Sequence, residues 1–204
     1  MVGLIGGVGS GKSSVAQCLQ VISPRPTVVI DADQLGHQVL QFPTVKERIL
    51  QRFGPTVFDS QGEISRSLLG RLVFGADAAA QQARRDLEAI VHPEIRKLAE
   101  QTIRELRQKQ QVELIVLDAA VLLEAGWNDV CDLVAFVDTP EADRIARVHA
   151  GRGWSAAELA KREAIQWPLP RKRAAADAVL DNSNSVEDAV RQLEEVISNR
   201  TSQM

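Results

Sequence analysis

The chain has 204 residues, 45% of them hydrophobic and 25% charged, which is ordinary for a globular protein. Its formal net charge of −3 argues against a protein that binds nucleic acid through phosphate contacts. No apolar run approaches the roughly 18 residues of a membrane span. The two cysteines, Cys18 and Cys131, lack metal-ligand spacing. We expect residues 1–204 to form one domain of a cytoplasmic protein with reduced thiols. A monomer is the favoured oligomeric state, and we expect no nucleic-acid or membrane partner.

A phosphate-binding motif stands near the start of the chain. Residues 6–13 read Gly-Gly-Val-Gly-Ser-Gly-Lys-Ser and fit the pattern Gly-x-x-x-x-Gly-Lys-Ser/Thr. The apolar run Val2–Ile5 precedes the motif and a helix-like segment, Ser13–Ile22, follows it, so a glycine-rich turn that matches by chance is disfavoured. In such a loop, backbone N–H groups surround a phosphate chain and Lys12 reaches the outer phosphates. The Ser13 hydroxyl coordinates Mg²⁺, so the motif predicts a nucleoside-triphosphate site with magnesium.

Short apolar runs alternate with longer amphipathic segments, the pattern of a doubly wound parallel sheet covered by helices. The predicted strands are Val2–Ile5, Val28–Ile30, Leu114–Leu117, Leu133–Val137 and Val179–Leu180. Three of these runs lead directly into an aspartate: Asp31, Asp118 and Asp138. Because open α/β sheets bind ligands at the carboxyl ends of their strands, these carboxylates are candidate site residues. Asp118 is the candidate to hold the magnesium shell.

The segment Asp31-Ala32-Asp33 offers two carboxylates after the second predicted strand. In an extended chain both would point the same way. Phosphoryl transfer to a hydroxyl needs a carboxylate that orients and deprotonates the acceptor, and these two aspartates could meet that need. The alternative is structural, because Asp33 could cap a helix over Gln34–Gln41. The residue types leave both interpretations open.

More than eighty residues separate Ile30 from Leu114, far more than one crossover helix needs. Apolar residues recur at three- and four-residue spacings from Leu87 to Leu106, which predicts helices over Ser65–Gln110. His92-Pro93 interrupts this pattern, and Pro93 would fit the first turn of a new helix. We expect a helical insertion over about residues 60–110.

A second excursion, residues 140–176, is strongly basic. It holds eight Arg or Lys against four Asp or Glu, a surplus of four positive charges in a protein of net −3. A basic segment near a triphosphate site predicts a lid that closes on phosphates, and the alternative is a solvated helical hairpin. Its densest cluster, Arg171-Lys172-Arg173, could bind a small polyphosphate or form a solvated helix start.

Taken in order, these motifs resemble the dephospho-coenzyme A kinase family of P-loop small-molecule kinases. The matching parts are the phosphate loop, residues 31–33, residues 87–93 with Arg96, residues 118–124, Gln166, residues 172–173, 176–177 and 181–183. The resemblance extends from residue 3 to about 185. The phosphate loop is shared by many nucleoside triphosphatases, whereas His92-Pro93 and the late Ala-Asp…Asn are more specific. The implied fold is a P-loop kinase-like, doubly wound, parallel five-stranded α/β sheet with a helical substrate-binding insertion and a basic lid.

The resemblance also implies the reaction: with Mg²⁺, the γ-phosphate of ATP passes to the 3′-hydroxyl of the dephospho-coenzyme A ribose, the last step of coenzyme A synthesis. It implies catalytic roles for Asp33 as the base, Lys12, and Arg147 from the lid. The implied ATP-binding residues are Gly9, Ser10, Gly11, Lys12, Ser13, Ser14 and, near the adenine, Asn182. Asp31, His92 and Arg96 would bind the acceptor, although His92 could equally be a capping or core histidine. Ser13 and Asp118 would serve the metal.

The chain departs from the family pattern at two places. Ala120 and Leu123 stand where the family usually has a proline and an aromatic residue in the loop after Asp118. In the lid, Gly151 occupies the position where the family often has arginine, and Arg152 follows it. These departures leave open whether the loop keeps its rigidity and whether Arg152 inherits the arginine's role.

Two rival functions share part of the pattern. Another small-molecule or nucleoside kinase shares every feature up to Asp33, and only His92-Pro93 argues against it. A GTP-binding switch would share Asp33-Gln34-Leu35-Gly36, which matches Asp-x-x-Gly. The chain contains no Asn-Lys-x-Asp for guanine, so the switch is disfavoured.

Overall fold

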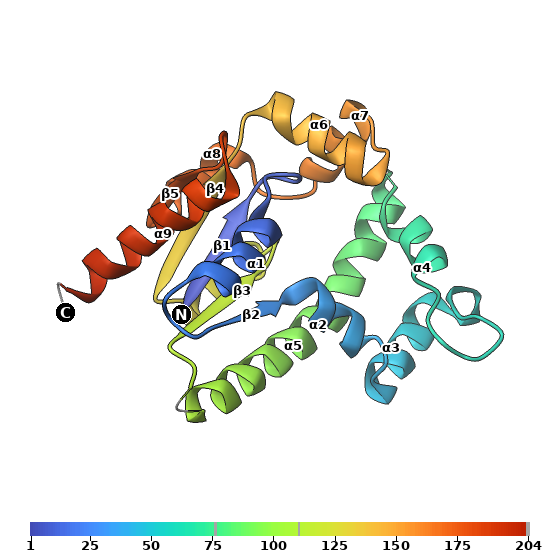
Figure 1. Ribbon diagram of the computed structural model, residues 1–204. Helices are drawn as coiled ribbons and strands as arrows, with labels where there is room; N and C mark the ends of the chain where they lie inside the picture. The colour runs from blue at the N-terminus through green and yellow to red at the C-terminus, as the bar shows by residue number, and fades with distance from the viewer. Residues whose placement is uncertain (76, 110, 203–204) are drawn as a thin grey trace. The chain divides into compact units, whose positions relative to one another are not determined.

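The computed structural model describes residues 1–75, 77–109 and 111–202 (Figure 1). The strands are β1 (Val2–Gly6), β2 (Thr27–Asp31), β3 (Leu114–Asp118), β4 (Leu133–Asp138) and β5 (Ala178–Asp181). The helices are α1 (Lys12–Ile22), α2 (Ala32–Val39), α3 (Pro43–Phe53), α4 (Arg66–Val73), α5 (Ala78–Gln108), α6 (Glu141–Arg152), α7 (Ala156–Glu163), α8 (Leu169–Ala174) and α9 (Val186–Thr201), with short 3-10 turns at Pro55–Val57 and Trp127–Val130. The chain forms two compact units, Met1–Asp31 with Glu105–Met204, and Ala32–Arg104.

The first unit is built on a five-stranded parallel sheet in the order β2-β3-β1-β4-β5. All five predicted strands are confirmed, as is the fold class. Register pairs Asp31 with Asp118 and Asp138 with Asp181, so four aspartates lie at the carboxyl edge of the sheet. This edge is where a parallel α/β sheet binds its ligands.

The core of the first unit explains why these strands are almost wholly apolar. Alternate strand residues such as Leu4 and Val116 pack with Val15 and Leu19 of α1 and with Leu193 of α9, all fully buried. Helices α1 and α9 contact each other and lie side by side against the sheet in Figure 1. Burial on both faces selects β-branched and aliphatic residues rather than an alternating pattern.

The second unit is helical and has its own core, formed by α3, α4, α5 and the turn at Pro55–Val57. Val45, Ile49, Val57 and Val73 are buried there and pack with Ile90 of α5. The predicted helices over Ser65–Gln110 are present as α4 and α5, whereas Ala76 and Gln110 lie outside the described residues. The assignment of residues 1–204 to a single domain, with subregions 60–110 and 140–176, stays a prediction.

The expected break at His92-Pro93 is wrong, because α5 runs through Pro93 without interruption. Proline has no N–H, so the carbonyl of Ala89, four residues earlier, loses its helical partner. Arg48 of α3 replaces that partner: its Nη2 donates to Ala89 O at 3.3 Å and its Nη1 to Ile90 O at 3.4 Å. A side chain from another helix therefore allows the helix to continue.

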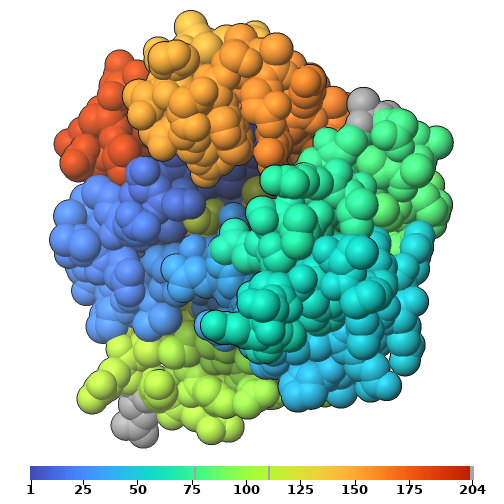
Figure 2. Space-filling view, turned by 90° about the vertical axis from the view of Figure 1, so that its right-hand side faces the viewer, coloured from blue at the N-terminus to red at the C-terminus, as the bar shows by residue number. Residues whose placement is uncertain are grey.

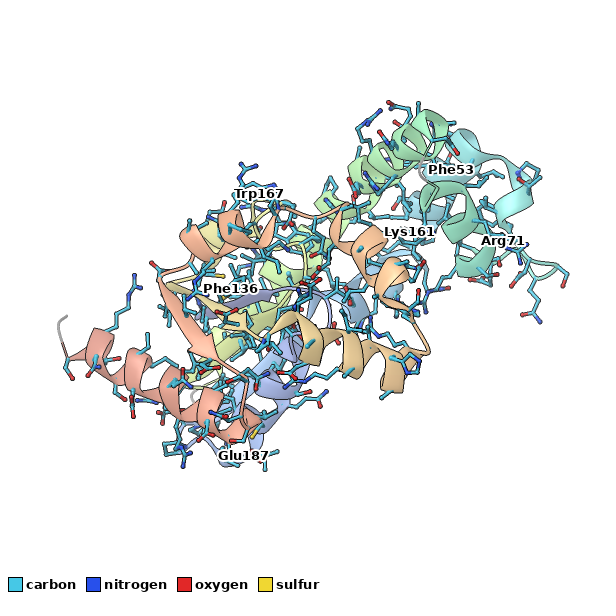
Figure 3. All side chains as sticks on the ribbon, turned by 90° about the horizontal axis from the view of Figure 1, so that it is seen from above. Phe53, Arg71, Phe136, Lys161, Trp167 and Glu187 are labelled. Atoms are coloured by element: carbon cyan, nitrogen blue, oxygen red, sulfur yellow. The ribbon has the colours of Figure 1, made fainter. Side chains whose placement is uncertain are left out.

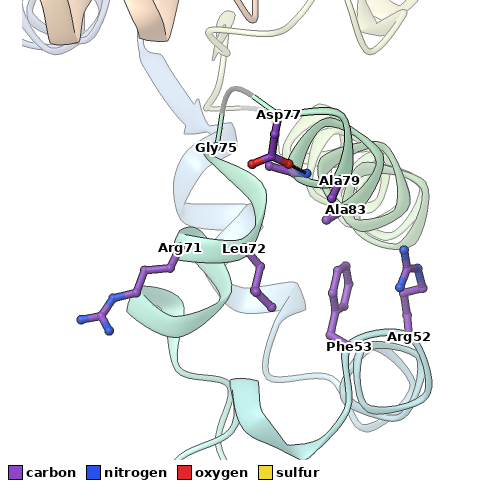
Figure 4. A pocket seen from close by; sticks show the side chains of 9 residues that line it. Arg52, Phe53, Arg71, Leu72, Gly75, Asp77, Ala79 and Ala83 are labelled. Carbon is purple, nitrogen blue, oxygen red and sulfur yellow. Dashed lines mark hydrogen bonds between the residues drawn. The ribbon is translucent and has the colours of Figure 1, made fainter.

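A cavity of about 450 Å³ opens in the second unit between α3, α4 and the start of α5. In Figure 4 the side chains of Phe53 and Leu72 point toward it while Arg71 points away. Among the described residues, no helix combines the length and apolar character needed to cross a membrane.

Candidate functional site

The phosphate loop connects β1 to α1 in the first unit, as the motif predicts. Gly9 and Gly11 adopt left-handed φ angles of 77° and 85°, which other residues rarely adopt, and Gly11 immediately precedes α1. Space is also limited at Gly11, where an added Cβ would lie 2.7 Å from Asn182 Nδ2. The loop therefore needs glycine for its backbone shape and for close approach, and it leads into a helix N-terminus suited to anions.

Lys12 lies over this loop and is almost fully buried, with 9% of its surface exposed. Its Nζ donates to the carbonyl of Gly7 at 3.1 Å. The ammonium is thus held at the loop, where a polyphosphate would be bound.

Ser13 and Asp118 meet at the carboxyl edge of the sheet. The Ser13 hydroxyl donates to Asp118 Oδ2 at 2.5 Å, and Asp118 is 7% exposed. These are oxygen donors of the kind that Mg²⁺ prefers, and Mg²⁺ commonly takes one or two protein ligands together with phosphate oxygens and water. The pair fits a magnesium ion bound with a nucleotide, and Asp31 lies beside Asp118 in register on β2.

The carbonyl of Ser10 joins three distant parts of the chain to the phosphate loop. It accepts hydrogen bonds from Asn182 Nδ2 at 2.8 Å, Thr139 Oγ1 at 2.9 Å and Arg147 Nη1 at 3.3 Å. Arg147 Nη2 also donates to the carbonyl of Asn182 at 3.1 Å. The structure therefore brings Arg147 and Asn182 to the loop, together with Thr139, which the sequence motifs did not identify. The one sequence feature that could have identified Thr139 is its position directly after Asp138, which ends β4.

The basic excursion, residues 140–176, contains α6, α7 and α8, and we refer to it as the lid segment; that it closes on phosphates stays a prediction. Figure 2 shows the orange atoms of α6 and α7 directly above the dark blue atoms of the first residues of the chain. The guanidinium carbons of Arg152 and Arg162 lie 4.7 Å and 4.8 Å from the ring centre of Trp154. Arg152 thus stacks on a lid tryptophan in this structure.

The cluster Arg171-Lys172-Arg173 is not a solvated helix start, which corrects that interpretation, whereas its binding of a small polyphosphate stays a prediction. It forms the last turn of α8, and Lys172 is completely buried. Lys172 Nζ donates to Ala120 O at 2.8 Å and Gln166 Oε1 at 2.9 Å, and pairs with Glu124 at 3.0 Å.

Glu124 also accepts a hydrogen bond from the backbone N–H of Trp167 at 2.7 Å. In Figure 3 Trp167 lies just ahead of α8, and Lys161 lies on α7. The loop after Asp118, which lacks the family's proline and aromatic residue, is thus anchored to α8 through Lys172 and Glu124.

Asp33 occupies the first turn of α2, in the second unit, with its side chain exposed. The expectation of an extended Asp31–Asp33 segment is wrong, because β2 ends at Asp31 and α2 begins at Ala32. Asp33 is also not the cap of a helix starting at Gln34, because it lies inside the helix. Asp33 lies in the first turn, where the positive end of the helix dipole stabilises a negative charge.

His92 and Arg96 lie one turn apart on α5, also in the second unit, and therefore share a helix face. Burial lowers the pKa of His92, and the negative charge of Glu88 partly opposes this. The imidazole is therefore mostly neutral at pH 7. Arg96 Nε donates to Glu100 at 2.8 Å, a pair in which both side chains are more than a third exposed.

The chain is similar to known proteins over almost its whole length. The family model described as dephospho-CoA kinase matches residues 1–188. A dephospho-CoA kinase from Geobacter sulfurreducens is 39% identical over 201 residues, which cover 98% of each chain.

Among solved structures, one from Thermus thermophilus has 34% identity and a TM-score of 0.78 over 97% of this chain and 96% of its own. A dephospho-CoA kinase from Campylobacter jejuni, at 20% identity and a TM-score of 0.68, shows the same fold over 100% of this chain and 98% of its own. The chain therefore belongs to the dephospho-CoA kinase family, whose activity is the final step of coenzyme A biosynthesis.

Proposed function

We propose that the phosphate loop binds ATP with Mg²⁺ and that the γ-phosphate passes to the 3′-hydroxyl of the dephospho-CoA ribose. The observation that carries this proposal is the 2.5 Å contact between the Ser13 hydroxyl and Asp118, at the carboxyl edge of the sheet and one residue from Lys12. A magnesium ion held there would neutralise charge on the β- and γ-phosphates.

On the ATP side, we assign the phosphates to the segment Gly9–Ser14. Helix α1 starts at Lys12, so the segment ends in the first turn of a helix, whose N–H groups favour anions. Lys12 would stabilise the charge that develops on the transferring phosphate. Arg147 donates to two carbonyls, those of Ser10 and Asn182, and an arginine fork in this place could bind phosphate oxygens in pairs. We assign Asn182 to the adenine end of the nucleotide.

On the acceptor side, we assign Asp33 as the base that takes the proton of the ribose hydroxyl. Asp31, His92 and Arg96 would bind dephospho-CoA, with Arg96 supplying a positive charge for its phosphates. His92, neutral at pH 7, would contribute a hydrogen bond. The second unit would therefore serve the acceptor and the lid segment would serve ATP.

We propose that the enzyme works as a monomer in the cytoplasm. The free thiols of Cys18 and Cys131 are compatible with a reducing compartment. Burial raises the pKa of the Cys131 thiol to about 11, so this thiol stays protonated and unreactive at neutral pH.

The direct test is incubation with ATP, Mg²⁺ and dephospho-CoA, followed by mass measurement of the product, with nucleosides and shikimate as competing acceptors. Asp33→Asn should keep ATP binding while lowering transfer by about 10²–10⁴-fold, because asparagine keeps the shape but cannot accept the proton. Asp31→Asn is the matched variant. Loss of transfer in Asp31→Asn with full activity in Asp33→Asn would reverse the assignment.

A further inference from the structure

Two side chains of the lid segment, outside the residues assigned above, hold the phosphate loop at Val8. Glu163 Oε1 accepts a hydrogen bond from the backbone N–H of Val8 at 3.1 Å. Arg144 Nη1 lies 3.4 Å from the carbonyl of Val8 and donates to it. Arg144 and Glu163 also form an ion pair with each other. Both backbone polar groups of one loop residue are thus bonded to a single ion pair that joins α6 to α7.

The glycines on each side of Val8 show how closely the pair approaches. A Cβ added at Gly7 would lie 2.9 Å from Glu163 Oε1 and 3.0 Å from Arg144 Nη1. A Cβ added at Gly9 would lie 2.9 Å from the carbonyl oxygen of Arg144. Both the side chain and the backbone of Arg144 therefore rest against the loop, which cannot move toward the lid segment without displacing them.

The pair is largely removed from water. Arg144 is 4% exposed, and the Glu163 side chain is 23% exposed. Within the described chain, Arg144 Nε is buried without a hydrogen-bond partner. Removing one member of such a pair leaves an uncompensated charge, whereas replacing both by apolar side chains is often tolerated. This difference allows stability and positioning to be measured separately.

We propose that Arg144 and Glu163 are positioning residues for ATP. Their ion pair fixes Gly7 and Val8 so that the following loop residues present their N–H groups in the orientation that phosphates need. Donors held in place before the ligand arrives bind it without a reorganisation cost. The proposal rests on the ATP site assigned above and adds two residues that would act through Val8 rather than by touching the nucleotide.

The test compares Glu163→Ala, Glu163→Gln and the double variant Arg144→Met/Glu163→Met by calorimetric ATP binding, by KM for each substrate and by thermal unfolding. Glu163→Ala should raise the Kd and KM for ATP about tenfold, the effect of losing one charge-assisted hydrogen bond, and leave the KM for dephospho-CoA within twofold. Glu163→Gln keeps an oxygen that can accept from Val8 and should recover part of the loss. Glu158→Ala is the control, because Glu158 lies on the same helix and pairs only with Arg162 in the contacts described.

The double variant is decisive. It should regain the unfolding temperature that Glu163→Ala loses, yet keep weak ATP binding, because methionine cannot bond Val8. If the double variant recovered both the unfolding temperature and the ATP affinity, the pair would only stabilise the fold and the proposal would be overturned. Native ATP affinity in Glu163→Ala would overturn it as well. Lys12→Ala serves as a reference: if it too binds ATP normally, the ATP site itself is wrongly assigned.

Discussion

Replacing Lys172 by methionine is the sharpest test of how the lid segment is anchored. Lys172 is completely buried and makes its three contacts with Ala120, Gln166 and Glu124 at 2.8 to 3.0 Å. Methionine fills most of the same volume but can neither donate a hydrogen bond nor carry a charge. The Glu124 carboxylate, 16% exposed, would keep its bond from Trp167 but lose its cation. Its second oxygen is already buried without a hydrogen-bond partner in the described chain.

The expected loss follows from this geometry. Removing one partner of a buried ion pair typically costs about 3–5 kcal/mol. In a chain of this size each kcal/mol corresponds to roughly 2–4 °C, so the midpoint of unfolding should fall by roughly 6–20 °C. The matched control is Arg173→Met, one residue along α8. Arg173 pairs with Asp138 at the surface, where the two side chains are 54% and 38% exposed, and such pairs contribute about 0–1 kcal/mol.

Tryptophan fluorescence is the appropriate assay, because the three tryptophans, Trp127, Trp154 and Trp167, all lie in the first unit. It reports on the unit that contains Lys172 and is insensitive to separate melting of the other. The double variant Lys172→Met/Glu124→Gln, which removes the charge but keeps an acceptor for Trp167, should recover at least half of the loss. Equal midpoints for Lys172→Met and Arg173→Met would refute the reasoning.

Three further predictions follow from the site. Lys12→Ala should lower kcat by about 10²–10³-fold in a steady-state assay without loss of folding, and near-native turnover would remove the phosphate loop from the mechanism. Arg147→Ala should release more free phosphate per coenzyme A formed, because the lid segment would then exclude water less well; unchanged rate and coupling would favour a solvated hairpin. Because burial lowers the pKa of His92, the unfolded chain binds more protons, so stability should fall as pH drops below 6.5; urea titrations should show a smaller fall in His92→Gln.

The strands and the phosphate loop could be predicted because their determinants are local. Strands β1, β3 and β4 are buried along almost their whole length and are therefore continuous apolar runs in the sequence. All five predicted runs are only one or two residues longer in the structure. The phosphate loop is one contiguous motif. The position of Asp118 at the carboxyl edge of the sheet could be predicted because the end of an apolar run is visible in the sequence, whereas its magnesium role stays a prediction.

Two of the failures share a physical cause, which is a partner far away in sequence. Pro93 breaks a helix by local rules, and the helix continues only because Arg48, forty-two residues before Ile90, supplies a donor. Thr139, which was not predicted, donates to the carbonyl of Ser10 from 129 positions away in the sequence. Asp33 was misplaced for a simpler reason, since β2 gives way directly to α2 without a turn residue that would mark the boundary.

The net charge of the lid segment shows why ion-pair partners that are distant in the sequence matter for a functional argument. Its surplus of four positive charges predicted a phosphate ligand, but much of that charge is bound by the protein itself. Arg144 pairs with Glu163, Lys172 with Glu124 and Arg173 with Asp138, and the last two carboxylates lie outside the segment. A charge count over a contiguous stretch cannot include partners supplied by other strands and loops. The better argument for phosphate binding is geometric: Arg147 donates only to carbonyls in the contacts described, so its charge has no carboxylate there to compete with a bound nucleotide.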